Sequence, residues 1–332
     1  MRHTLLTVCV LSAAGPAFAD ADWFASLYTQ EGVELRADER VFTLYALFNV
    51  MGYDAAPVVR KDPVPKYDFH PVRAAVRAQL AAADAEVRRQ AEQFFDSHPQ
   101  PLDKYLAYVV NSAPPPFTTG AKSKELSDLK GLEALLAKAH HSWKLGELMA
   151  QTQSDYRRAL KAYLRTLDVP LSKARKLLKA PEEGLESLLV VNLLEAQGVT
   201  RGVMGDREVV LVVGPSDKPD LEGVLREYAR VLLEPKVSKK AQTSWAGGAA
   251  LLREARLVGA SERTVGEYAA ALLSRALALR ALDAADAVYE AATQQGYFGL
   301  KDIAKSFDDS RAVDAWALEA LAKAETRRPA KK

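Results

Sequence analysis

The sequence predicts an α+β fold in which helices dominate and the β-structure is small. Along most of residues 37–325, apolar side chains recur at the 3.6-residue spacing of amphipathic helices. Two runs break this pattern, residues 185–194 and 208–213, and both are rich in leucine and valine, as buried strands are. We therefore expect a predominantly helical domain with a small β-sheet or hairpin.

The first part of the domain, residues 37–180, is predicted to be helical. Residues 41–51 are apolar enough to form a buried helix. Further helices are expected at the alanine-rich residues 72–95 and at residues 102–110. Between residues 126 and 167 the helical spacing continues, which predicts one long helix or two joined helices.

The β-structure is predicted as a hairpin over residues 185–213. Its strands are the two leucine- and valine-rich runs. The segment between them contains three glycines that suit a loose connection: Gly198, Gly202 and Gly205.

Helices are expected again after the hairpin. Residues 219–234 have the spacing of an amphipathic helix, which Pro219 starts and Pro235 ends. The C-terminal part, residues 249–325, contains four further helical segments, at residues 265–282, 284–295, 300–307 and 312–324.

The first 19 residues have the features of a secretory signal peptide. Arg2 precedes an apolar run over residues 5–14, and Ala17 and Ala19 are the small residues that a signal peptidase requires before Asp20. The single cysteine, Cys9, lies within this leader. We therefore expect an exported protein, periplasmic or secreted, that is held together by its core without disulfides.

The charge balance argues against nucleic acid as a partner. Without Arg2 the chain has 44 Lys and Arg (45 minus 1) against 43 Asp and Glu, so no global positive field exists. Residues 326–332 form a basic tail, which has no aromatic residues for stacking on bases. No second apolar stretch is long enough to span a membrane, so we expect no membrane span after the leader is removed.

One segment has the spacing of a metalloprotease zinc motif. Arg226 and Arg230 flank Glu227 at the two positions where His-Glu-x-x-His carries histidine, and Pro235 follows. With Tyr228 as its aromatic residue, this run resembles the His-Glu-aromatic-x-His...Pro segment of a poorly characterised family of secreted bacterial gluzincin-type metallopeptidases.

Other segments resemble the same family. Residues 208–213, followed by Gly214, look like the strand that runs beside the active-site cleft of such enzymes, and Glu267 looks like their glutamate zinc ligand. Residues 37–40 and 296–298 are also similar. The resemblance implies a gluzincin-like, peptidase-like domain over residues 20–325.

The two arginines change the chemistry that the motif implies. Neutral imidazoles hold zinc, whereas guanidinium stays protonated and has no lone pair to give a cation. The histidines outside the leader do not have metal-ligand spacing either: His70, His98, His140 and His141. We therefore expect no metal, no cofactor and no catalytic residue, with Glu227 as a vestige of the general base.

In a gluzincin-like fold, Arg226 and Arg230 would project toward Glu267 and supply the positive charge that the metal once gave. Glu267→Ala would then leave a partly buried cation unpaired and, if the site is buried, cost about 3 kcal/mol.

Three functions remain open. The leading expectation is an exported, non-catalytic metallopeptidase-like protein that binds a peptide or protein through four residues: Arg226, Tyr228, Arg230 and Glu267. The first alternative is an active, atypical or zinc-independent hydrolase that uses Glu227. The second is a helical interaction scaffold unrelated to peptidases, in which residues 219–234 form an ordinary amphipathic helix.

Overall fold

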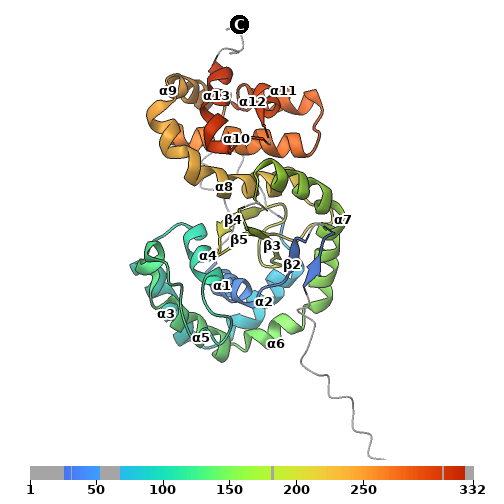
Figure 1. Ribbon diagram of the computed structural model, residues 1–332. Coiled ribbons are helices and arrows are strands. Elements are labelled where there is room, and N and C mark those ends of the chain that lie inside the picture. Colours follow the sequence, from blue (N-terminus) through green and yellow to red (C-terminus); the bar gives the residue numbers. More distant parts are fainter. Residues whose placement is uncertain (1–25, 31, 53–67, 181–182, 309, 326–332) are drawn as a thin grey trace, which may run out of the picture.

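The computed structural model describes residues 26–30, 32–52, 68–180, 183–308 and 310–325 (Figure 1). The expected signal peptide and basic tail lie outside the described residues. Within them the fold is α+β and predominantly helical, with one small mixed sheet, which confirms the fold class.

Helices build the N-terminal part, as predicted. In order they are α1 (Glu39–Val50), α2 (Pro71–Ala81), α3 (Ala85–Ser97), α4 (Leu102–Val110), the 3-10 helix η1 (Lys124–Leu129), α5 (Leu132–Ser142), α6 (Leu145–Ala150) and α7 (Gln153–Leu177).

Two predicted helices are divided into shorter ones. The single helix expected at residues 72–95 ends at Ala81, and Asp84 starts a new helix by accepting a hydrogen bond from the Glu86 amide at 2.9 Å. The one or two helices expected at residues 126–167 are η1, α5, α6 and α7. Gly131 and Lys144 have positive φ angles of 103° and 50°, which interrupt the helical backbone before α5 and α6.

The sheet has five strands in the order β1-β2-β3-β5-β4. They are β1 (Leu27–Tyr28), β2 (Glu34–Arg36), β3 (Glu186–Val191), β4 (Thr200–Met204) and β5 (Glu208–Val213). Strands β2, β3 and β5 are parallel, while β1 and β4 are the antiparallel edge strands.

The predicted hairpin over residues 185–213 is therefore wrong in its pairing. Its two strands, β3 and β5, are parallel neighbours, and β4 lies between them in sequence and pairs antiparallel with β5. Parallel central strands are covered on both faces, so they appear in sequence as the continuous apolar runs seen here. Strand β4 lacks such a run because Arg201 and Gly202 interrupt it.

The register gives the sheet two distinct faces. Glu186 is paired with Glu208, and Arg36 is paired with Val190, so the side chains of Arg36, Glu186 and Glu208 share one face. Arg201 lies on this face as well and contacts Asp103 of α4 at 3.4 Å, so the face is turned toward the N-terminal helices.

The opposite face carries α8 (Leu221–Ser244). A Cβ atom at Gly202 would lie 2.7 Å from the Val231 side chain, so this glycine allows the helix to approach the strand closely. The predicted apolar face of α8 is buried: Val224, Leu225, Tyr228, Val231 and Leu232.

Helix α8 does not end at Pro235, as expected, but runs through it to Ser244. A proline inside a helix removes one backbone hydrogen bond. Buried residues beyond it, Val237 and Ala241, keep the helix packed on its neighbour α10 (Val265–Ala281). Packing therefore overrides the local stop signal.

Four C-terminal helices match the predicted segments closely: α10, α11 (Asp286–Gln294), α12 (Leu300–Ser306) and α13 (Val313–Glu325). A fifth helix, α9 (Gly248–Leu257), was not among the predicted segments. Figure 1 shows these helices gathered beyond α8, at the opposite end of the molecule from α1 to α6. None of the described helices is long and apolar enough to cross a membrane.

Candidate functional site

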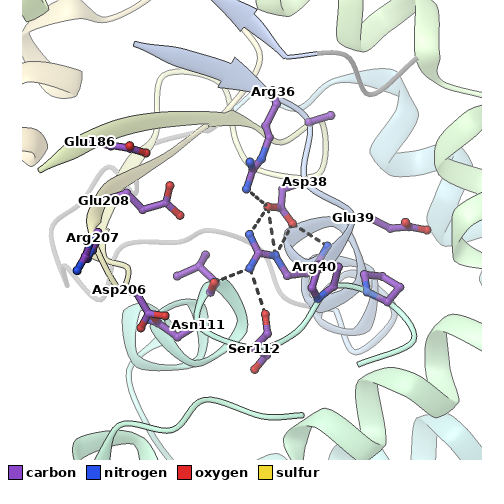
Figure 2. Close-up of a pocket in the computed structure, with 14 residues that line it drawn as sticks. Arg36, Asp38, Glu39, Arg40, Asn111, Ser112, Glu186, Asp206, Arg207 and Glu208 are labelled. Carbon is purple, nitrogen blue, oxygen red and sulfur yellow. Dashed lines mark hydrogen bonds and ion pairs between the residues drawn. The ribbon is translucent and has the colours of Figure 1, made fainter. Parts of the chain in front are cut away.

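A pocket of about 640 Å³ opens where β2 turns into α1, on the sheet face that is turned toward the N-terminal helices (Figure 2). Its walls come from four segments: residues 36–40, the end of α4 with residues 111–115, the start of β3, and the β4–β5 turn with the start of β5. We call it the acidic pocket, after the carboxylates of Glu186, Asp206 and Glu208 that line it.

Asp38 organises one wall of the acidic pocket. Its carboxylate caps α1 by accepting from the Arg40 amide at 2.9 Å. The Arg40 guanidinium donates to the same carboxylate from Nε at 3.0 Å and from Nη2 at 2.6 Å, and Arg36 Nη2 donates at 3.1 Å. The side chain of Asp38 is 5% exposed, so these are largely desolvated ion pairs.

Both arginines make further contacts within the protein. Arg40 Nη1 also donates to the carbonyls of Val110 at 2.5 Å and Ser112 at 3.1 Å, and Arg36 Nη1 donates to Glu34 at 3.0 Å. Burial alone would raise the pKa of Asp38, but the hydrogen bonds and charges of Arg40, together with the charge of Arg36, hold it below its usual value. Asp38 is therefore an ionised structural group and not a free nucleophile.

A second lining carboxylate is also used by the protein. Glu39 Oε1 lies 2.6 Å from Nε2 of His140, which comes from α5. In Figure 2 the Glu39 side chain points away from the other carboxylates of the acidic pocket.

The opposite wall has three carboxylates that make no direct contact with a basic side chain in the described part of the chain. Within the described residues, no hydrogen bond or ion pair joins the side chains of Glu186, Asp206 or Glu208 to a basic group. Figure 2 shows Glu208 directed into the pocket, toward Arg36 and Arg40, whereas Arg207 is turned to the outer side.

Glu208 has the most unusual environment of these three groups. Burial raises its pKa, and the charges of Glu34 and Asp38 raise it further, against the lowering effect of Arg36 and Arg40. A carboxylate whose charged form is disfavoured in this way gains energy when a ligand brings a positive charge to it.

This arrangement suits a cationic ligand group. Several donors of the two arginines go to Asp38, Glu34 and backbone carbonyls, which leaves fewer of them for an anion. The excess of unpaired carboxylates, together with the depth of Glu208, favours an ammonium or guanidinium group.

The residues that the sequence indicated lie elsewhere, around α8 and the start of α10. Arg230 and Glu267 line one pocket of about 400 Å³, which we call the α8–α10 groove; it is completed by Glu234, Ser261, Glu262, Arg263, Ala270 and Ala271. The structure thus brings two of the predicted binding residues to one groove.

The hydrogen bonds of Arg230 go to groups other than Glu267. Its Nε donates to Glu227 at 2.8 Å, its Nη1 to Glu234 at 2.9 Å and its Nη2 to the Gly202 carbonyl of β4 at 2.9 Å. Burial would lower its pKa, but Glu227 and the other nearby carboxylates raise it. Arg230 therefore ties α8 to the edge of the sheet.

Glu267 is exposed and has a local role. Its carboxylate accepts from the Arg263 amide at 2.7 Å and from the Thr264 amide, while Thr264 Oγ1 accepts from the Glu267 amide. This reciprocal pair is a capping box that starts α10. The premise of a buried Glu267 holding an arginine is not met.

The other two predicted residues differ in burial. Tyr228 is fully buried, and its hydroxyl accepts from Ser187 of β3 at 3.4 Å, so it belongs to the core between α8 and the sheet. Arg226 is half-buried, and its charge lowers the pKa of Tyr297 against the stronger effect of burial. The described contacts contain no ion pair between Arg226 and Glu267.

The zinc that the family resemblance implies does not fit these residues. Arginine occupies both histidine positions, Glu227 is engaged by Arg230, and Glu267 is engaged by backbone amides. No group of three or more potential ligand residues in the described parts of the chain is placed to hold a metal ion. We derive no chemistry through zinc.

Sequence reasoning did not single out the acidic pocket. Residues 37–40 were noted for their family resemblance and not as a site. The alternation of charge over Glu34, Arg36, Asp38 and Arg40 was the available signal, since period-two spacing places the side chains of Glu34, Arg36 and Asp38 on one side of an extended segment, and Arg40 follows at the start of α1. Glu208 carries no comparable signal, because its pocket forms only when β5 pairs with β3.

Comparison with protein-family models, curated proteins and solved structures finds no significant match to this chain.

Proposed function

We propose that this chain is an exported, non-catalytic protein of metallopeptidase-like ancestry that binds a peptide or protein segment at the acidic pocket. A lysine or arginine side chain of the partner is seated against Glu208. The carboxylates of Glu186 and Asp206 at the rim add to the attraction.

One observation carries the binding proposal. Arg36 and Arg40 are hydrogen-bonded to Asp38, Glu34 and backbone carbonyls, while the half-buried Glu208 makes no direct hydrogen bond or ion pair with a cation among the described residues and interacts with the two arginines only at longer range. Leaving a carboxylate half-buried and unpaired costs stability, which suggests that it is kept for a ligand.

Ancestry and the absence of catalysis rest on the α8–α10 groove. Arg230 and Glu267 line this groove, and the helices that carry them, α8 and α10, are packed on each other, which supports the proposed ancestry. Glu227, the remaining residue of the motif, accepts from Arg230, so it is not available to activate water.

The unrelated-scaffold alternative is favoured by one specific observation. The capping box with Thr264 explains Glu267 completely, without a peptidase ancestor. This alternative does not affect the proposal for the acidic pocket.

Binding is tested by calorimetric titration with short peptides that differ only in one side chain, lysine in one and its uncharged acetylated form in the other. We expect the lysine peptide to bind more tightly, and Glu208→Gln to remove most of the difference. Glu267→Gln is the matched control, because it removes one negative charge from the α8–α10 groove. Equal binding of the two peptides would rule out the acidic pocket as a cation site.

The non-catalytic part is tested separately by measuring zinc in the natively purified protein by mass spectrometry. We expect much less than one zinc per chain. About one zinc per chain, removable together with peptidase activity, would show that other ligands form an active centre.

A further inference from the structure

The outer face of α7 has an unusual row of positive charges. Arg157, Lys161 and Arg165 are spaced four residues apart, and all three are exposed. Side chains at this spacing lie one above the other on a helix, and like charges there repel each other. The buried residues of α7 occupy its other side, including Tyr156, Leu160, Tyr163 and Leu167.

No acidic group offsets this row within the described residues. Arg157, Lys161 and Arg165 have no hydrogen bond or ion pair there. The two acids nearest in sequence are engaged elsewhere: Asp155 accepts from Arg158 at 2.5 Å, and Asp168 Oδ2 accepts from the Gln30 amide at 3.4 Å. Since the whole chain is close to neutral, the positive charge is a local feature of this face.

Exposed apolar side chains lie at the end of the row. Val169, one further step of four residues along α7, is 64% exposed. The contact between Gln30 and Asp168 ties β1 to α7 at this point, and Tyr28 on β1 is 62% exposed. Figure 1 shows α7 at the edge of the molecule, beside β2.

We propose that this α7 face is a docking surface for an anionic lipid bilayer. The apolar face of α7 is buried in the protein, so the attraction comes from its basic side chains meeting lipid phosphate groups, and the exposed valine and tyrosine beside them can enter the headgroup region. A nucleic acid is less suitable, because single strands require aromatic platforms between the cations.

The test is cosedimentation of the protein with vesicles of phosphatidylcholine alone and of phosphatidylcholine mixed with phosphatidylglycerol, at low salt. We expect binding to the mixed vesicles only. Each cation near an anionic surface contributes a factor of about five to the partition coefficient, so Arg157→Gln, Lys161→Gln and Arg165→Gln together should weaken binding about a hundredfold.

The matched control removes the same charge from another exposed surface, by Lys122→Gln, Lys124→Gln and Lys130→Gln. It should change binding much less. All variants are purified with the same N-terminus, so that any leader residue contributes equally, and circular dichroism confirms that they are folded.

The apolar contribution is tested by Val169→Ser with Tyr28→Ser, which should lower the binding that persists at higher salt. No binding to the mixed vesicles, or an equal loss in both triple variants, would overturn the proposal. The proposal would also be overturned if the protein bound duplex DNA as tightly as the mixed vesicles and if Val169→Ser with Tyr28→Ser left the DNA binding unchanged. The surface would then recognise polyanions in general.

Discussion

The acidic pocket and the α8–α10 groove both combine arginines with carboxylates, but they use them differently. In the groove, Arg230 and Glu267 are both engaged by the protein itself, in cross-links and in a helix cap. In the acidic pocket, Asp38 binds both arginines, and Glu208 makes no direct hydrogen bond or ion pair with a cation in the described structure. Charged residues in a groove therefore indicate a binding site only if they are not already paired with other groups of the protein.

The largest effect is expected for Asp38→Asn. The change would leave Arg36 and Arg40 without their shared carboxylate and weaken the cap of α1, which should destabilise the protein by about 3 kcal/mol at neutral pH. Urea denaturation of the two proteins measures this difference.

The control for Asp38 is Asp206→Asn, at an exposed position of the same pocket, which should cost less than about 0.5 kcal/mol. The loss in Asp38→Asn should also depend on pH. Because the folded protein lowers the pKa of Asp38, its contribution is complete above the ordinary value of 3.8 and disappears as the pH falls through the lower folded value. Equal losses in the two variants would contradict the structural role of Asp38.

The next effect concerns Arg230→Ala. This change removes the donors to Glu227, to Glu234 and to the Gly202 carbonyl, and we expect a loss of about 2 kcal/mol, less than for a fully buried pair because the side chain is 30% exposed. Arg226→Ala on the same helix is the control and should cost clearly less. If the two losses were equal, Arg230 would not be the link between α8 and β4.

A smaller effect is expected for Glu267. If its role is the capping box, Glu267→Ala costs about 1 kcal/mol, and Glu267→Gln costs little because glutamine also completes the box. The sequence-based hypothesis of an arginine partner predicts about 3 kcal/mol for alanine and a large loss for glutamine as well. Thermal unfolding of both variants decides between the two roles.

The smallest effect is expected for Glu208→Gln, and its sign is opposite. Because burial raises the pKa of Glu208 in the folded protein, ionisation of this group opposes folding above that pKa. We expect the variant to be more stable than the parent at neutral pH, by less than about 1 kcal/mol. Below the ordinary value of 4.5 both side chains are neutral, so the advantage should vanish there. A destabilised variant at neutral pH would show that an internal partner holds the carboxylate.

Much of the fold could be predicted from periodicity, and the errors have physical causes. Helices α10 to α13 and strands β3 and β5 could be located because their apolar patterns are regular. The parallel pairing of β3 with β5 could not be predicted, because the direction of a strand depends on what covers the sheet. Strand β4, which lies between them in sequence, is too polar to be recognised as a strand. Pro235 was taken as a helix end because local propensity does not include the packing of α8 against α10.

The candidate site was harder to predict. The spacing of Arg226 and Arg230 correctly indicated a helix with a polar row, but their partners come from other elements, such as the Gly202 carbonyl of β4. The acidic pocket depends on which carboxylates remain unpaired after folding. That property belongs to the tertiary structure, and no motif around Glu208 encodes it.

The most direct test of the central claim is to measure the pKa of Glu208 by carbon NMR, with and without a saturating lysine-containing peptide. We predict a pKa above the ordinary 4.5 in the free protein, and a clear decrease when the peptide is bound, because a nearby cation stabilises the charged form. The same pKa in both states, with the peptide bound, would contradict the claim that Glu208 receives the cation.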